Sequence, residues 1–140
     1  MLSEKTFSEL NVDDAAQFDV VIDDTLVDAF ASLSGDRSPL HTDETFAAQT
    51  PLQKRVAHGM IAGALFSRLV GMHLPGKHAL YLSQTLFFRK PVFLPTTVMV
   101  TGVVRQKSDA TRIITLSTTL TDVATGTVLV DGEALVKVLV

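Results

Sequence analysis

Near the start of the chain, a β-branched run is followed by apolar residues at helical spacing. The run FDVVID, residues 18–23, is rich in valine and isoleucine and predicts a strand that ends at the pair Asp23 and Asp24. One of these carboxylates is suited to cap a helix that runs to about Ser34 and ends at Gly35. The apolar positions of this helix, three or four residues apart, are Leu26, Val27, Phe30 and Leu33.

Two further helices are predicted before residue 75. The stretch HTDETFAAQ, residues 41–49, indicates a short helix with Thr42 or Asp43 as its cap and Phe46 turned toward the core. The chain is then apolar on nearly every side from His58 to about Leu74, which is typical of a helix surrounded by protein. Proline and glycine at positions 75 and 76 mark its end.

Beyond Lys77 the pattern changes to strands. Four segments are dense in β-branched and aromatic residues, with hairpin turns expected at 107–110 and 123–126. Partial alternation, as in RIITLSTTLTD, indicates a sheet with one buried face and one wetter face. A long buried helix and an antiparallel sheet of about five strands would cover each other, so the predicted fold class is α+β, in a single domain over residues 1–140.

Composition narrows the classes of function. The chain of 140 residues has no cysteine, which excludes disulfides and thiolate sites and makes the cytoplasm the expected compartment. The net charge of −3 offers no basic stripe for nucleic acid, and neither a signal peptide nor a membrane span is predicted. Because 46% of the residues are hydrophobic and only 19% are charged, we expect some apolar surface to be buried between subunits.

Candidate chemistry lies in the loop SGDRSPLH, residues 34–41. Asp36 and His41 flank Pro39, which fixes its own backbone and extends Ser38, so both side chains can be held toward one water. A carboxylate and an imidazole that share a water form a general acid–base pair. Taken alone, however, the loop is more typical of a turn in which Asp36 caps the backbone and His41 packs or caps.

The second candidate element is AHGM, at the start of the long apolar helix. Unpaired backbone N–H groups and the positive end of the helix dipole meet there, and Gly59 lets a substrate oxygen approach the main chain. This suits an oxyanion hole for a thioester carbonyl, with a close-packing glycine as the alternative interpretation.

Together these segments carry a family resemblance. SGDRSPLHTDETFA resembles the hydratase motif of the MaoC-like (R)-specific enoyl-CoA hydratases, and AHGMIAGALFSRLVGMHLPGKHALYLSQTLFFRKPVF resembles the segment that follows it in short bacterial members. The match extends from about Ala29 to Phe93. It implies a hot-dog fold, in which the sheet wraps a central helix, and a homodimer with sites near the subunit interface. The implied reaction is reversible syn hydration of a trans-2-enoyl thioester to an (R)-3-hydroxyacyl thioester, without metal or redox cofactor.

The resemblance also implies roles for single residues. Asp36 and His41 match the catalytic acid and histidine of the family, and Gly59 matches the residue whose backbone N–H receives the thioester oxygen. Ser67 matches a serine of the active-site neighbourhood. Ser38 stands where relatives commonly carry asparagine, and it reaches less far as a supporting hydrogen-bonding group.

For an acyl-CoA substrate, the acyl chain is expected along the central helix, with Ala62, Phe66 and Val70 shaping its pocket, although such helix positions are also typical of core. No cation is assigned to the CoA phosphates among the five considered, which are Lys54, Arg55, Lys77, Arg89 and Lys90.

Three alternatives to a hydratase stay open. An acyl thioesterase would use the same fold, and a silent acyl-thioester binding module would keep the pocket without turnover. A metal site built from Asp36, His41 and His58 is conceivable by residue type, but metal-binding spacings such as HxH and HExxH are absent, so no metal is expected.

Overall fold

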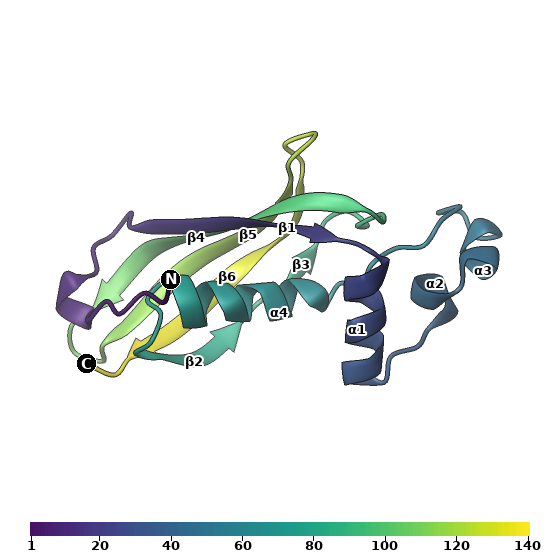
Figure 1. Cartoon of the computed structure of the whole chain (residues 1–140). Coiled ribbons are helices and arrows are strands. Elements are labelled where there is room, and N and C mark those ends of the chain that lie inside the picture. Colours follow the sequence, from purple (N-terminus) through teal and green to yellow (C-terminus); the bar gives the residue numbers. More distant parts are fainter.

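A six-stranded antiparallel sheet forms the body of the protein, which the computed structural model describes over residues 1–140 (Figure 1). The strands are β1 (Ala15–Ile22), β2 (Ala79–Gln84), β3 (Phe87–Phe88), β4 (Thr96–Ser108), β5 (Ile113–Asp122) and β6 (Val128–Val138). Their spatial order is β1-β4-β5-β6-β2, and the short β3 also pairs with β6. Consecutive hairpins join β4, β5 and β6, as the sequence predicts, because turn residues separate long β-branched runs.

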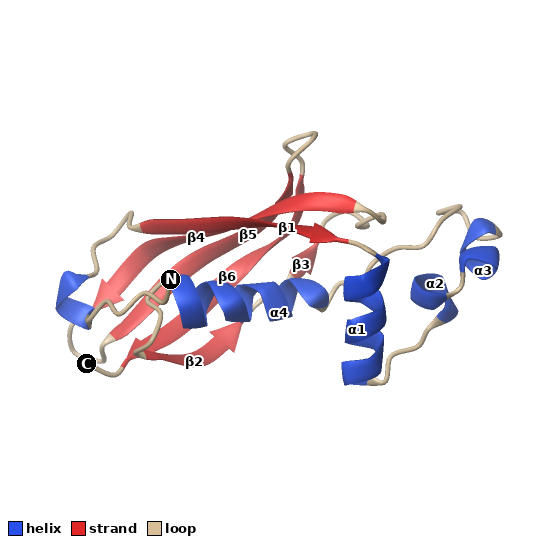
Figure 2. Ribbon diagram, viewed as in Figure 1, coloured by secondary structure: helices blue, strands red, loops and turns tan.

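The helix α4 (Ile61–Arg68) lies along one face of this sheet and continues as the π-helical segment η2 (Leu69–His73), as Figures 1 and 2 show. Phe66 and Leu69 are fully buried in one core cluster with Val98 and Val100 of β4. Val70 belongs to a second cluster, which includes residues from the first half of β5 and the second half of β6. Burial of each such side chain contributes roughly 1.5–3 kcal/mol, so helix and sheet stabilise each other. The predicted α+β architecture is confirmed.

Three short helices lie at and beyond the N-terminal end of α4 (Figure 1). They are α1 (Asp24–Ser34), α2 (Pro39–Thr42) and α3 (Glu44–Ala48), and a single 3-10 turn, η1 (Phe7–Glu9), lies near the N-terminus. Asp23 caps α1 by accepting from the N–H of Leu26, and Gly35 ends it with a φ of 78°. Asp43 caps α3 in the same way. No helix in the structure is both long and apolar enough to cross a membrane.

The structure corrects two expectations. Phe46 is 45% exposed, and its neighbour Ala47 is the residue that α3 buries, since one and a half turns of helix leave the orientation of the buried face open. The central helix begins at Ile61, because residues 58–60 form a turn before it. The sheet of six strands agrees with the expected sheet of about five, and the additional strand arises because the segment after Lys77 divides into β2 and the two-residue β3.

Candidate active site

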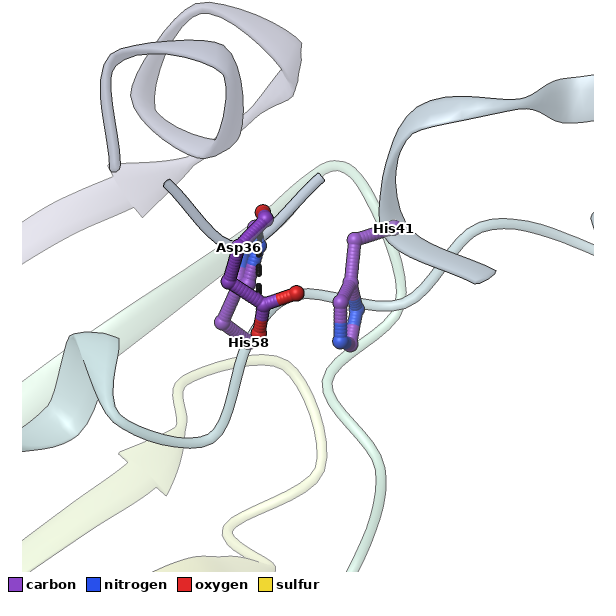
Figure 3. Close-up of side chains that lie close together, drawn as sticks. All are labelled: Asp36, His41 and His58. Atoms are coloured by element: carbon purple, nitrogen blue, oxygen red, sulfur yellow. Dashed lines mark hydrogen bonds and ion pairs between the residues drawn. The ribbon is translucent and has the colours of Figure 1, made fainter. Parts of the chain in front are cut away.

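The loop between α1 and α2 fixes the Asp36 carboxylate by local backbone contacts (Figure 3). Gly35 ends α1 in the left-handed conformation, and the chain turns at once. The backbone N–H of Ser38 then donates to Asp36 Oδ1 at 3.1 Å, an Asx-turn that orients the carboxylate. Pro39 opens α2, where its missing N–H costs nothing. The Asp36 side chain is thus oriented while 51% of it stays exposed.

Ser38 supports this loop through its backbone, while its hydroxyl makes no hydrogen bond in the structure. Its carbonyl oxygen accepts from the backbone N–H of His41 at 2.9 Å, which starts the single turn of α2. Ser38 therefore supports the loop through its main chain, and its side chain adds no contact to Asp36 or His41.

His41 lies on α2 with one ring nitrogen engaged and the other free. Its Nδ1–H donates to the backbone carbonyl oxygen of Val56 at 2.7 Å, and a carbonyl only accepts, so the proton is on Nδ1. In the neutral imidazole, Nε2 therefore carries the lone pair. A backbone acceptor that fixes the tautomer in this way prepares an imidazole to act as a base.

His58, just before Gly59, completes a cluster with these two residues (Figure 3). Asp36, His41 and His58 each contribute a polar atom, and these atoms lie within 4.8 Å of one another. The His58 ring stacks on that of His41, with centroids 4.0 Å apart. Sequence reasoning considered His58 only as a metal ligand. Its position beside Gly59, at the start of an otherwise apolar stretch, was the signal available.

Arg55 binds the loop to α1, which sequence reasoning also missed. Its Nε–H donates to the backbone carbonyl oxygen of His41 at 2.6 Å. Its other guanidinium nitrogens form ion pairs with Asp24 and Asp28, both of α1. The planar fork of arginine suits this three-way contact. Arg55 therefore holds the His41 backbone against α1 and is not free for a phosphate.

Hydrogen bonds to backbone carbonyls oppose chelation of a metal by this cluster. Nε2 of His58 lies 2.9 Å from the carbonyl oxygen of Asp36 and must carry the hydrogen. Nδ1 of His41 is engaged in the same way by the carbonyl oxygen of Val56. The arrangement suits proton transfer between Asp36, His41 and a water better than metal binding.

Gly59 lies next to the cluster and lines a separate cavity of about 300 Å³. Its backbone N–H makes no hydrogen bond in the structure. A Cβ added at Gly59 would lie 2.8 Å from Cε1 of Phe88, so only glycine fits under that ring without displacing it. Besides these two residues, the cavity is lined by Ala57, Arg89, Lys90, Pro91, Val92 and Val130.

The remaining predicted site residues lie along α4 and η2. Ser67 is exposed on the helix surface, and its hydroxyl makes no hydrogen bond. Ala62, Phe66 and Val70 are at most 3% exposed, line no cavity and pack in the core. Their part in an acyl pocket stays a prediction. An entirely apolar cavity of about 180 Å³ lies between α1 and α4, lined by Leu26, Ala29, Phe30, Leu33, Ile61, Ala64 and Leu65.

Comparison with known proteins shows the family of the chain. Residues 11–125 match the family model described as "MaoC like domain". The chain belongs to this MaoC-like family. It is 43% identical over 111 residues to the (R)-specific enoyl-CoA hydratase of Aeromonas caviae, covering 79% of this chain and 82% of that protein. It is 44% identical over 109 residues to the 3-hydroxybutyryl-CoA dehydratase of Methylorubrum extorquens, covering 78% and 68%.

Solved structures of the family agree with the observed fold. The R-hydratase PhaJ1 from Pseudomonas aeruginosa, in its unliganded form, superposes with a TM-score of 0.90 at 37% identity, covering 95% of this chain and 84% of that one. The (R)-hydratase from A. caviae involved in PHA biosynthesis gives a TM-score of 0.88 at 40% identity, covering 92% and 97%. The MaoC-like chain therefore has the hot-dog fold.

Proposed function

We propose that this protein is an (R)-specific enoyl-CoA hydratase that adds water reversibly to trans-2-enoyl thioesters. The observation that carries the proposal is the tautomer of His41: Val56 holds the proton on Nδ1, so a free lone pair on Nε2 lies beside the oriented Asp36 carboxylate. The names of the relatives from A. caviae and M. extorquens support the same chemistry.

The reaction needs one proton removed and one delivered on the same side of the substrate. The water oxygen adds to C3 while the Asp36–His41 pair takes a water proton, and the pair delivers a proton to C2. The electron pair of the C2–C3 bond passes transiently to the thioester oxygen, where the free N–H of Gly59 stabilises it. Because both transfers come from one pair, addition is syn. The reaction is redox-neutral, and we propose that it requires neither metal nor redox cofactor.

Hydration of crotonyl-CoA tests this function directly. The purified protein should remove the ultraviolet absorbance of the conjugated enoyl thioester and give the (R)-3-hydroxy product. Asp36→Asn and His41→Ala should each lower kcat by about 10²- to 10⁴-fold, because each removes half of the acid–base pair. Asp109→Asn, in the turn after β4, is a matched control that should keep full activity.

Four outcomes would contradict the proposal. Release of free CoA thiol without loss of the double bond would identify a thioesterase, and binding of crotonyl-CoA without turnover would identify a silent binding module. An (S) product, or full activity in both Asp36 and His41 variants, would also exclude the proposed mechanism.

We also propose that the protein acts as a homodimer, joined through the β2 and β3 edge of the sheet. The strand β2 ends the sheet with its outer edge unpaired. Four large apolar side chains of this edge are about half exposed, namely Leu80, Leu82, Phe87 and Phe88. Such a patch is typical of a subunit interface. Phe88 also lines the cavity at Gly59, so a partner here would lie beside the site.

Sedimentation velocity tests the dimer. The unaltered protein should sediment with twice the mass of the chain, and Leu82→Lys should shift it toward the monomer because it places a charge in the interface. Val123→Lys, in the turn between β5 and β6 with similar exposure, is the control and should leave the mass unchanged. A monomer before any substitution would refute this arrangement.

A further inference from the structure

We propose that His58 is a positioning residue, which holds both Asp36 and His41 in the geometry of proton transfer without exchanging protons itself. The proposal rests on the hydratase function proposed above and adds a third residue to its site. It is carried by three features of one buried side chain: a hydrogen bond to the loop, a stack on the catalytic ring, and a ring nitrogen closed off from any partner.

The hydrogen bond links the start of α4 to the catalytic loop. Nε2–H of His58 donates to the backbone carbonyl oxygen of Asp36 at 2.9 Å, and Oδ2 of the same residue lies 4.0 Å from that nitrogen. The His58 side chain is only 3% exposed, so this contact is shielded from water. The carboxylate of Asp36 is half exposed, but the backbone that carries it is held by this buried hydrogen bond from His58.

Ring contacts restrain the His41 ring. The His58 ring packs at a tilt against two neighbours: His41, with centroids 4.0 Å apart, and Phe30 of α1, with centroids 4.8 Å apart. Phe30 packs against the core around α4. The contacts from Phe30 to His58 and from His58 to His41 therefore fix the His41 ring relative to α1. Together with Val56, which holds Nδ1, this stack leaves the His41 ring little freedom to rotate.

The second nitrogen of His58 explains why it positions and does not catalyse. Nε2 must carry the hydrogen, because its partner is a carbonyl, so Nδ1 carries the lone pair. Nδ1 is buried and has no hydrogen-bond partner. A nitrogen without access to water or substrate has no route for a proton. A buried acceptor without a partner also costs stability, which is the kind of cost found at functional sites.

Three substitutions separate the two contacts of His58. His58→Gln keeps a donor near the position of Nε2 but removes the ring, His58→Phe keeps the ring but removes the donor, and His58→Asn removes both. We expect kcat for crotonyl-CoA to fall by about 10- to 100-fold in His58→Asn, with KM changed less than about twofold, because misplaced catalytic groups slow the chemistry more than binding. Glutamine and phenylalanine should each restore part of the lost kcat.

The matched control is His73→Asn, at the opposite end of the same helix, where a histidine also stacks on an aromatic ring. It should leave kcat unchanged. Full kcat in folded His58→Asn would overturn the proposal. So would equal losses in all three His58 variants that follow the fraction of folded protein, since that result indicates a merely structural role.

Amide exchange keeps this inference separate from the proposed function. The N–H of Ser38 donates to Asp36 Oδ1, so its exchange rate reports on the orientation of the carboxylate. It should rise in His58→Asn and less in His58→Gln, whether or not crotonyl-CoA is the substrate. If the unaltered protein has no hydratase activity, only the proposed function is refuted. If the Ser38 exchange rate in His58→Asn equals that of the unaltered protein, the positioning role is refuted.

Discussion

Two histidines lie at the two ends of the central helix, and both stack on an aromatic ring, yet their surroundings differ. His58, before α4, is buried, donates to the backbone of Asp36 and stacks on His41. His73, at the end of η2, is only half-buried, stacks on Phe18 and makes no hydrogen bond through its side chain. A histidine beside an apolar helix therefore indicates a site only when its polar atoms contact other chemistry-bearing groups.

The same contrast holds for two glycines near these histidines, and of the comparisons between the two ends of the helix it gives the largest expected effect on kcat. A Cβ at Gly59 would lie 2.8 Å from the Phe88 ring, whereas a Cβ at Gly71 would meet nothing within 4 Å. Gly59→Ala should lower kcat about tenfold or more, because the displaced ring and main chain move the N–H away from the thioester oxygen. Steady-state kinetics with crotonyl-CoA measures this effect.

Gly71→Ala is the control at the other end of the helix. It should keep kcat and raise the free energy of unfolding by about 0.4–1 kcal/mol, because alanine restricts the unfolded chain. Equal kcat values in the two alanine variants would show that the Gly59 N–H has no part in catalysis.

Arg55, near the site at the N-terminal end of the central helix, provides the next test. Its expected effect on kcat is smaller than that of Gly59→Ala. Arg55→Met removes the donor to the His41 carbonyl oxygen and both ion pairs with α1. We expect the free energy of unfolding to fall by about 1–3 kcal/mol, as for a hydrogen bond from a charged donor. In addition, kcat should fall several-fold, because α2 is then less firmly held against α1. Denaturant titration and steady-state kinetics measure the two effects.

Arg105→Met is the matched control, on an exposed position of the inner strand β4. Arg105 pairs with Asp13 at 3.5 Å, and both side chains are largely exposed. Exposed ion pairs contribute little, so its loss should change stability by less than about 0.5 kcal/mol. If Arg55→Met behaved like Arg105→Met, the contact to His41 would be incidental.

Local features of this site follow from the sequence, whereas contacts between distant residues do not. The Asp23 cap and the left-handed Gly35 are short-range choices that propensity predicts. Asp36 and His41 lie five residues apart, so one rigid turn brings them together. The partners of His58 and Arg55 are 22 and 14 residues away and meet only because α1 packs against the start of α4.

The acyl pocket shows a second kind of limit. The segment from Ile61 to His73 is apolar on nearly all sides, so its sequence does not tell which side faces the sheet. Ala62, Phe66 and Val70 pack in the core, and the apolar cavity opens toward α1. An amphipathic helix would have given the orientation, because its polar stripe marks the outer face.

The smallest expected effect concerns His73 and its dependence on pH. Partial burial, and then the positive charge of Arg68, lower the pKa of His73 below its ordinary value of 6.5. Near and below that pH the unfolded chain therefore binds more protons than the folded one. The contribution of the neutral His73 ring to the free energy of unfolding is full above about pH 6.5 and is lost as the pH falls.

Chemical denaturation at several pH values measures this loss. The free energy of unfolding should decline as the pH falls, and the decline should be shallower in His73→Gln. The lowered pKa values of Asp14 and Glu9 act only near and below their ordinary values of 3.8 and 4.5, so they leave this window clear. An identical slope in the variant between pH 5 and 7 would show that the stack of His73 on Phe18 accepts the charged ring as readily as the neutral one.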